Sequence, residues 1–251
     1  DSVLANTYAQ FNWNIPASAI FTTNCDIYYG CTDSAACNYL STATVDDGSC
    51  FYGNCVENIT QNTFSADIQT AINSSISGDT IIVSPGTFVE NVVINSKEIV
   101  LASKFLLNND TSYISSTIID GNQNGSVISI DSASTIIGFT IENGLAYNSG
   151  GIYMGDYQTS PTNVFLNNLI FKNNSCYNDG DALMKDGGDL TINNCKFYNN
   201  GIDGNNGRTI YNSSGNLAID NSIFINNNCD FVIESYNGSF SLKNTYLNTN
   251  S

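Results

Sequence analysis

The sequence contains no histidine, and this absence removes several kinds of chemistry at once. A Ser-His-Asp triad, a Cys-His pair and a zinc or iron site with imidazole ligands are all excluded. Basic residues are also scarce, since 7 lysines and arginines stand against 23 acidic residues, and none precedes Lys97. The net charge of −16 argues against nucleic acid or an anionic membrane as a partner, because phosphate groups need clustered basic side chains.

Long apolar runs are missing as well. No stretch approaches the ~20 residues that a membrane-spanning helix needs, so we expect no membrane span. Cysteine, in contrast, is plentiful: the chain has 8, and five of them lie between Cys25 and Cys55. This usage indicates an oxidising location, extracellular or at the cell surface. Because the chain begins at Asp1 rather than Met, we interpret it as processed or trimmed.

The composition divides the chain into three parts, namely an extended N-terminal segment (1–24), a small disulfide-rich module (25–57) and one large domain (64–251). The large domain opens with apolar residues at helical spacing, Ile68, Ala71 and Ile72. With Ser65 as N-cap, this spacing predicts a short helix over 65–77. From Asp79 onward the apolar period changes to two, which is typical of strands.

An internal repeat dominates the large domain. The segments NNLIFKNN, NNCKFYNN and DNSIFINN place Phe171, Phe197 and Phe224 in one column. A second column contains GGIYM, GDALM, GRTIY and CDFVI, and a third contains TNVFLNN, GDLTINN, GNLAIDN and GSFSLKN. Each unit thus has three short strands separated by Gly and Asn turns. One unit cannot bury its apolar face alone, so the units stack. We therefore predict an all-β fold, a parallel β-helix whose N-terminal end is capped by the helix.

Asparagine recurs at one corner of the repeat, at Asn168, Asn194, Asn221 and Asn244. Two interpretations stay open: the amides form a hydrogen-bonded ladder from rung to rung, or they only fill the turns. No cap comparable to the N-terminal helix follows Leu247. We therefore expect either that the chain continues past Ser251 or that another molecule covers the last rung.

Part of this pattern resembles a known superfamily. The segment GDTIIVSPGTFVENVVI (78–94) resembles the first coil of the pectin-lyase-like, right-handed parallel β-helix proteins, and IQTAI before it is similar to the capping helix of pectin methylesterases and their non-enzymatic relatives. FKNN, FYNN and FINN with GGIY also resemble the paired repeats of autotransporter adhesins. The resemblance implies a right-handed coil over 64–251. It implies no single activity, because the superfamily includes lyases, hydrolases, esterases and adhesins.

The cysteine-rich stretch GCTDSAACNYLSTATVDDGSC (30–50) resembles a module found in secreted and surface proteins of marine bacteria of the Bacteroidetes type. This resemblance implies a location outside the cell rather than a chemistry. The disulfide candidates are Cys25, Cys31, Cys37, Cys50 and Cys55, which form at most two internal bridges. Asp33, Asp46 and Asp47 are candidate Ca²⁺ ligands, Ca²⁺ being the one cofactor considered. Disulfides alone, disulfides with Ca²⁺ and a four-cysteine zinc site remain alternatives. Cys176, Cys195 and Cys229 are predicted to be buried free thiols.

Four aspartates crowd the segment NDGDALMKDGGD, at positions 179, 181, 186 and 189. They are interpreted as turn residues, with a Ca²⁺ site or a hydrolytic carboxylate pair as alternatives. Arg208, Lys172, Lys185 and Lys196 are interpreted as solvated surface charges. A cation held beside two or more carboxylates on the surface of the coil would instead favour an enzyme. Asn-X-Ser/Thr triplets make Asn58, Asn73, Asn109, Asn124, Asn173, Asn212 and Asn237 candidates for glycosylation.

The favoured function is that of an extracellular structural or adhesive protein without catalytic activity, such as a subunit of a surface filament. Its partners would be other protein chains of the assembly or surface glycans. The alternative is a carbohydrate-active enzyme, a lyase or hydrolase of acidic polysaccharide. A glycan-binding module that uses the exposed tyrosines Tyr147, Tyr153 and Tyr157 is a further alternative.

Overall fold

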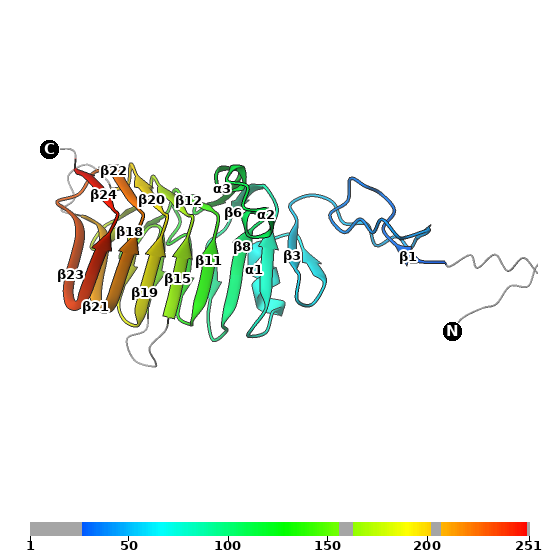
Figure 1. Ribbon diagram of the computed structural model, residues 1–251, viewed down its shortest axis with the longest axis horizontal. Helices are drawn as coiled ribbons and strands as arrows, with labels where there is room; N and C mark the ends of the chain where they lie inside the picture. Colours follow the sequence, from blue (N-terminus) through cyan, green and yellow to red (C-terminus); the bar gives the residue numbers. More distant parts are fainter. Residues whose placement is uncertain (1–26, 156–162, 202–206, 250–251) are drawn as a thin grey trace, which may run out of the picture.

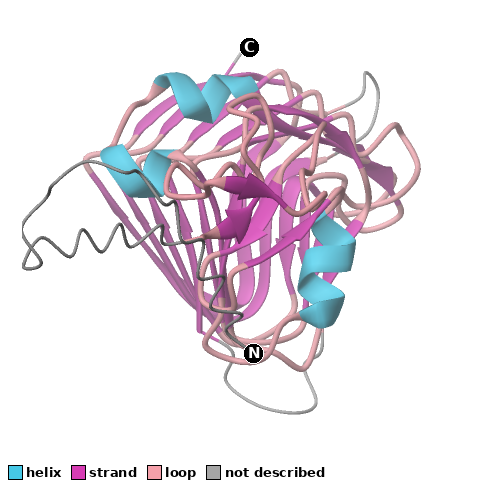
Figure 2. Ribbon diagram, turned by 90° about the vertical axis from the view of Figure 1, so that its right-hand side faces the viewer, coloured by secondary structure: helices cyan, strands magenta, loops and turns pink. Residues whose placement is uncertain are grey.

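The computed structural model describes residues 27–155, 163–201 and 207–249, so the predicted segment 1–24 lies outside the described residues. The body is a right-handed parallel β-helix whose rungs stack along one axis (Figure 1). Seen along that axis, strands surround the core and the helices lie at the periphery (Figure 2). The predicted fold class, with its capping helix and small Cys-rich module, is confirmed.

Three faces of parallel strands form the coil. Face 1 contains β7 (Val92–Ile94), β10 (Ile128–Ile130), β14 (Ile152–Met154), β18 (Gly180–Lys185) and the first halves of β21 (Arg208–Asp220) and β23 (Phe231–Lys243). Face 2 contains β5 (Thr80–Val83), β8 (Ile99–Ser103), β11 (Ser134–Ile137), β15 (Asn163–Asn167), β19 (Asp189–Asn193) and the second halves of β21 and β23. Face 3 contains β6 (Gly86–Val89), β9 (Thr117–Asp120), β12 (Thr140–Glu142), β16 (Ile170–Lys172), β20 (Lys196–Tyr198), β22 (Ile223–Asn227) and β24 (Tyr246–Thr249).

Smaller elements lie between and before these faces. Strands β13 (Leu145–Ala146) and β17 (Ser175–Cys176) pair at a corner, and helices α2 (Phe105–Asn108) and α3 (Ser112–Ser116) connect β8 to β9. At the N-terminal side are β1 (Tyr29–Gly30), β2 (Val45–Asp46), β3 (Val56–Asn58), β4 (Thr63–Ser65) and helix α1 (Ile68–Ser74).

Rung-to-rung register places like residues on one another in the core. On face 3 the predicted phenylalanine column forms: Phe171 pairs with Phe197, and Phe197 with Phe224. Their rings are stacked, with centroids 4.5 and 4.4 Å apart and planes nearly parallel. All three side chains are fully buried. Such aromatic stacks add specific contact energy to the burial of a large apolar area.

The corner asparagines serve mainly as turn residues. Asn168, Asn194, Asn221 and Asn244 all have positive φ, between 48° and 55°. Asparagine tolerates this left-handed conformation because its side chain hydrogen-bonds locally. The ladder between them is partial: the amide of Asn194 donates to Asn168, but Asn221 donates to Asn193 and Asn244 to Asp220.

A second asparagine column, which the sequence did not lead us to predict, lies inside the coil. Asn174, Asn200 and Asn227 are buried. The Nδ2 of Asn200 donates to the Phe171 carbonyl (3.1 Å) and to Oδ1 of Asn227 (2.9 Å), and Asn174 donates to Oδ1 of Asn200 (3.2 Å). The backbone N–H groups of Asn174 and Asn200 also donate to the amide oxygen one rung on, at 3.1 Å in each case. This ladder satisfies backbone groups where the chain turns inside the buried core.

Helix α1 covers the N-terminal end of the stack. Its buried residues are those predicted, Ile68, Ala71 and Ile72, and it packs against β3, β4, β5 and β7. The helix is shorter than predicted, and its N-cap is Asp67 rather than Ser65, because the Asp67 carboxylate accepts the Thr70 N–H at 2.7 Å. Strand β3 pairs antiparallel with both β4 and β5, so a hairpin covers the edge that β5 would otherwise leave open.

The register of β18 differs from the alignment in the sequence. Ile152 pairs with Leu183 rather than Ala182, and the ladder to β21 shifts between Gly180 and Leu183. This irregularity is a β-bulge, in which one extra residue is accommodated and the side chains beyond it are redirected. As a result Lys185 pairs with Met154 on one side and with Asn212 on the other, in a column of side chains that face inward.

The module that precedes the coil is small. Strands β1 and β2 pair in parallel, and a disulfide joins Cys31 to Cys50. No helix among the described residues is long and apolar enough to cross a bilayer.

We expect Phe197→Ala to lower the free energy of unfolding by about 3–5 kcal/mol, because it removes a fully buried ring and both of its stacking contacts. The matched control is Phe165→Ala on face 2, where the ring is 50% exposed and the loss should stay below about 1 kcal/mol. Urea unfolding followed by circular dichroism measures both. Equal losses for the two variants would contradict the role of the stack.

A second prediction concerns the buried ladder. Asn200→Asp removes two amide donors and buries a carboxylate beside a carbonyl oxygen, so we expect a loss of at least ~2 kcal/mol that grows as the pH rises from 4 to 7. The control Asn221→Asp lies at the exposed corner and should cost less than ~1 kcal/mol. Urea unfolding at several pH values tests the pair, and a pH-independent loss at Asn200 would refute the explanation.

Candidate functional site

Face 1 contains the group of charged and aromatic side chains best suited to chemistry. In the stacked register, the residues that face outward along its middle column are Val93, Ser129, Tyr153, Met184, Tyr211 and Glu234. Tyr211 and Glu234 are direct neighbours on β21 and β23. Arg208, at the start of β21, lies opposite Gly180 of β18.

Arg208 is held between two carboxylates. Its Nε pairs with Glu234, and its Nη1 lies 3.5 Å from Oδ1 of Asp179. The guanidinium carbon also lies 5.4 Å from the centre of the Tyr211 ring, within the range of a cation–π contact. All of these side chains are only partly exposed. The site therefore has a cation, two acidic groups and an aromatic ring within contact of one another.

The electrostatics of this cluster differ between its members. Burial raises the pKa of Asp179 above its ordinary value, and the nearby Arg208 only partly opposes that effect. Burial also raises the pKa of the Tyr211 phenol, and Asp179 and Glu234 add to the effect. Burial acts to lower the pKa of Arg208, but the hydrogen bond that its guanidinium donates to Glu234 raises it. The net effect is an increase, so the guanidinium stays charged. Asp179 is thus the carboxyl group in the cluster that holds a proton to higher pH than usual.

A shallow hollow continues the cluster along face 1 toward the N-terminal rungs. Val93, Ser129, Asp131, Tyr153 and Gly155 line it together with backbone of the inward residues between them. The Tyr153 hydroxyl donates to Oδ2 of Asp186 at 3.0 Å, and Asp186 contributes to the raised pKa of Asp179. The hollow and the Arg208 cluster therefore share one stretch of surface.

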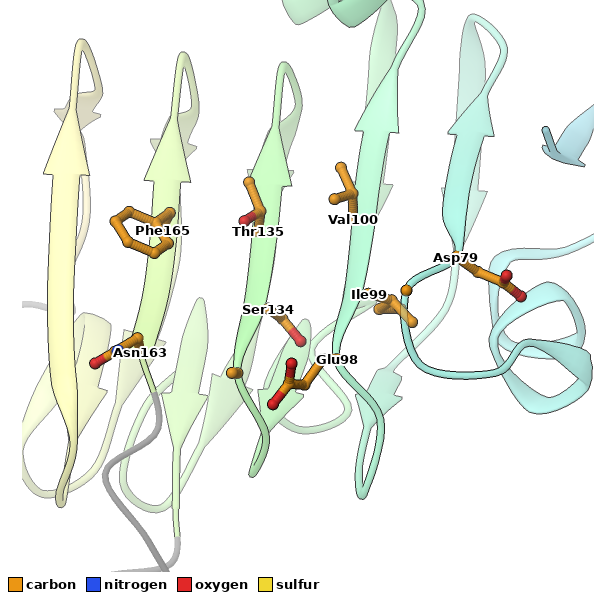
Figure 3. A pocket seen from close by; sticks show the side chains of 10 residues that line it. Asp79, Glu98, Ile99, Val100, Ser134, Thr135, Asn163 and Phe165 are labelled. Carbon is orange, nitrogen blue, oxygen red and sulfur yellow. The ribbon is translucent and has the colours of Figure 1, made fainter. Parts of the chain in front are cut away.

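Face 2 has a second hollow, lined by residues of β8, β11 and β15 and of the segment before β5 (Figure 3). Its two carboxylates have different surroundings. Asp79 is buried and accepts hydrogen bonds from Asn58, Gln61 and the Ile76 N–H, so it holds the N-terminal hairpin in place. Although its burial acts to raise the pKa, these donors outweigh burial and lower it. Glu98 is then the only other acidic group in the lining, and a carboxylate pair for hydrolysis is not formed.

The four crowded aspartates separate in the structure. Asp179 contacts Arg208, Asp186 contacts Tyr153, and Asp189 accepts the backbone and side-chain N–H groups of Asn216. Asp181 points into the coil, where Oδ1 accepts the Cys176 N–H at 3.0 Å and Oδ2 is buried without a hydrogen-bond partner. Burial raises the pKa of Asp181 to about 6. Interpreting all four as turn residues missed the roles of Asp179 and Asp181.

The predicted surface cations also differ. Lys172 forms a 2.5 Å ion pair with Glu142, whereas Lys185 is fully buried and not solvated as expected. The amine of Lys185 donates to Oδ1 of Asn212 at 3.0 Å and to the Ser214 carbonyl. Burial lowers the pKa of Lys185 to about 8. The β18 bulge, invisible in the aligned sequence, turns this side chain inward.

The predicted Ca²⁺ ligands are not brought together. Asp33, Asp46 and Asp47 each accept a backbone N–H two residues further on, at 2.9, 3.0 and 2.9 Å. The backbone hydrogen bond from Ala35 lowers the pKa of Asp33, and Tyr52 adds to the effect. A side-chain hydrogen bond from Ser49, followed by the backbone hydrogen bond from the same residue, lowers the pKa of Asp47. In the part of the chain that the structure describes, no group of three or more acidic or cysteine side chains could hold a metal ion. The three aspartates are turn residues in this arrangement.

Of the disulfide candidates, Cys31 and Cys50 are bridged, Cys37 and Cys55 are free thiols, and Cys25 lies outside the described residues. Cys176, Cys195 and Cys229 are thiols outside any disulfide, as predicted, with Cys229 partly rather than fully buried. Burial raises the pKa of Cys176 and of Cys195 to about 12 in each case. Neither is a reactive thiolate at neutral pH.

Two glycosylation candidates must be corrected. Asn58 is buried and its amide donates to Asp79 at 2.8 Å, and Asn212 is buried with its amide donating to Ser235 at 2.9 Å. A glycan on either amide nitrogen would break these contacts, and the buried position leaves no room for it. The other candidates, Asn73, Asn109, Asn124, Asn173 and Asn237, are exposed and stay predictions.

No protein-family model and no curated protein matches the chain. Among solved structures, a crystal structure of pectin methylesterase from Aspergillus niger in a partly deglycosylated form matches 78% of this chain and 84% of its own, with 16% identity and a TM-score of 0.32. A match at this level assigns no activity or site to the chain. The resemblances to adhesin repeats and to modules of marine bacteria stay predictions.

The prediction that the chain is not an enzyme is corrected. Arg208 lies beside Asp179 and Glu234, which is the arrangement named above as contrary to that prediction. Glu234 was missed because it lies 26 residues from Arg208 in the sequence and reaches it only through the stacking of β21 on β23. The isolated position of the sole arginine, at the start of a repeat strand, was the one available signal.

The buried Asp181 predicts a pH effect on stability. Its pKa in the folded state, about 6, exceeds the ~3.9 of an unfolded chain, so its stabilising effect is present below pH ~4 and is lost as the pH rises through 6. Asp181→Asn removes this loss, and we expect the free energy of unfolding of the variant to gain about 3 kcal/mol relative to the parent between pH 4 and 7.5. Urea unfolding is measured for both proteins at each pH. The difference between them removes the contributions of all other titratable groups, because these groups are the same in both proteins. A constant difference across that range would contradict the assignment.

Proposed function

We propose that the chain is a carbohydrate-active protein that binds a glycan along face 1 and hydrolyses it at the Arg208 cluster. The observation that carries this proposal is the contact of one guanidinium with two carboxylates and a tyrosine ring. Arginine orients carboxylates through fixed donor geometry, and hydrolysis of a glycosidic bond needs two positioned carboxyl groups.

The two carboxyl groups have distinct roles in this proposal. Asp179, whose pKa is raised by burial, donates a proton to the oxygen of the leaving sugar. Glu234, in contact with the Arg208 Nε, acts as the carboxylate that either activates water or attacks the sugar carbon. Arg208 holds both groups and, as a permanent cation, keeps the second carboxylate oriented.

The charge of the site favours an uncharged glycan. Asp179, Asp186 and Glu234 surround a single cation, so a polyuronate would be repelled, in contrast to the acidic polysaccharide considered from the sequence. The rings of Tyr153 and Tyr211 lie in the same outward column and offer amphipathic surfaces on which sugar rings can pack. Lys185 is unsuited to act as the base of a lyase reaction because it is buried and hydrogen-bonded within the coil.

An extracellular location fits this function. The Cys31–Cys50 disulfide is typical of an oxidising compartment, where polysaccharides are met. The filament or adhesive role favoured from the sequence stays a prediction, since no observation on the described residues tests it.

The test uses purified protein with neutral polysaccharides and, for comparison, uronate polymers. We expect reducing sugars to be released from a neutral polymer, and Asp179→Asn, Glu234→Gln and Arg208→Ala each to lower that rate by about 10²–10⁴-fold. The control is Lys196→Ala, an exposed lysine on face 3, which should keep the parent rate.

Binding is measured in parallel by co-sedimentation with the insoluble polymers. Binding without release by the parent would identify a glycan-binding module and refute the catalytic role. Unchanged rates in the three variants would show that the reaction takes place elsewhere, and neither binding nor release would overturn the proposal as a whole.

A further inference from the structure

Two free thiols lie together where the small module meets the coil. The Cys37 N–H donates to the Phe51 carbonyl at 2.7 Å, and the Cys37 sulfur lies 3.6 Å from the Gly53 carbonyl. Cys37 therefore lies beside residues 51–53, which come shortly before Cys55 in the chain. Cys37 is close enough to Cys55 for its thiol to be one of the groups that raise the pKa of Cys55, together with burial as the largest cause. Cys55 is buried and Cys37 is partly exposed.

Cys55 is anchored to the coil. Its carbonyl accepts the Ser84 N–H at 2.8 Å, and the next residue, Val56, pairs with Val83 at the end of β5. Cys37, in contrast, belongs to the module that the Cys31–Cys50 bridge closes on itself. A covalent link between Cys37 and Cys55 would therefore fasten the module to the first rung of the coil.

We propose that Cys37 and Cys55 form a second disulfide, which staples the N-terminal module to the capped end of the β-helix. The order of the four cysteines, 31, 37, 50 and 55, makes the two bridges interleave. If the chain is cut within the loop that one bridge closes, the other bridge still joins its two cysteines. Only the Cys37–Cys55 bridge reaches a residue that is hydrogen-bonded into the sheets, so it alone decides whether the module and the coil stay attached after cleavage between them.

The reaction is a thiol–disulfide exchange with an external disulfide, either small or carried by a protein oxidant. Cys37, the more exposed thiol, loses its proton and attacks one sulfur of that reagent, which releases one thiol and leaves a mixed disulfide on Cys37. The Cys55 sulfur then attacks the Cys37 sulfur, loses its proton to solvent and releases the second thiol. Two protein thiols are oxidised and one external disulfide is reduced. Burial raises the pKa of Cys55 to about 12, which fits Cys37 as the thiol that reacts first.

The absence of basic residues before Lys97 offers a sharp test. Tyr52 is 56% exposed and lies between Cys50 and Cys55, so Tyr52→Arg introduces a single tryptic site in the module. The full chain with this change is oxidised with glutathione disulfide, treated with trypsin, and run on gels with and without reductant. We expect one band without reductant and separate N-terminal and coil fragments with it. In Tyr52→Arg with Cys37→Ser and Cys55→Ser, the fragments should separate without reductant.

Peptide mapping of the alkylated, unreduced parent provides a second readout that does not depend on the engineered site. A peptide pair joined through Cys37 and Cys55 supports the proposal. Separation of the Tyr52→Arg fragments without reductant, a pairing of either thiol with Cys25, or alkylation of both thiols after oxidation would overturn it. The matched control, Cys176→Ser in the coil, should leave the gel pattern of the Tyr52→Arg protein unchanged, because Cys176 is buried far along the sequence on β17.

Discussion

The parallel stacking of one rung on the next is the constraint on which the rest of this structure depends. Backbone hydrogen bonds between rungs require each residue to lie next to its counterpart in the neighbouring rung. Every inward column must therefore be filled by side chains that pack well against similar side chains. Phenylalanine meets this demand on face 3 by stacking, and asparagine meets it at the inner corner by linking amides. Both columns are buried, and the asparagine column also satisfies backbone groups at the turn of the chain.

The candidate site follows from a local departure from that regular stacking. The extra residue in β18 bends face 1 between Gly180 and Leu183. Asp179 lies at the entrance to this bulge and Asp181 inside it, so one carboxylate contacts Arg208 while the other is buried. The same bulge turns Lys185 inward. Bulges commonly re-aim side chains near functional sites, and here one irregularity separates a surface acid, a buried acid and a buried amine.

The two ends of the described structure are maintained in different ways. At the N-terminal end, the β3–β4 hairpin covers the edge of β5, and helix α1 covers the core. Asp79 ties the hairpin to the first rung through hydrogen bonds from Asn58 and Gln61. The small module depends on covalent chemistry instead, because its few buried residues form too little core to stabilise it without a bridge. The contrast explains why the cysteines concentrate before Val56.

The sequence by itself determined the fold class, the capping helix and most of the stacking. Repeated units with apolar residues at every second position bury those residues by stacking on one another. The Phe171, Phe197 and Phe224 column was predictable for that reason. Only the tertiary structure decided which charges meet. Glu234 reaches Arg208 from the neighbouring rung, and the bulge in β18 shifts the register so that Lys185 points inward. The repeat in the sequence shows which residues align between rungs. A one-residue bulge, however, reverses the direction in which the following side chains point. The position of the bulge depends on packing in three dimensions, which the sequence pattern does not contain.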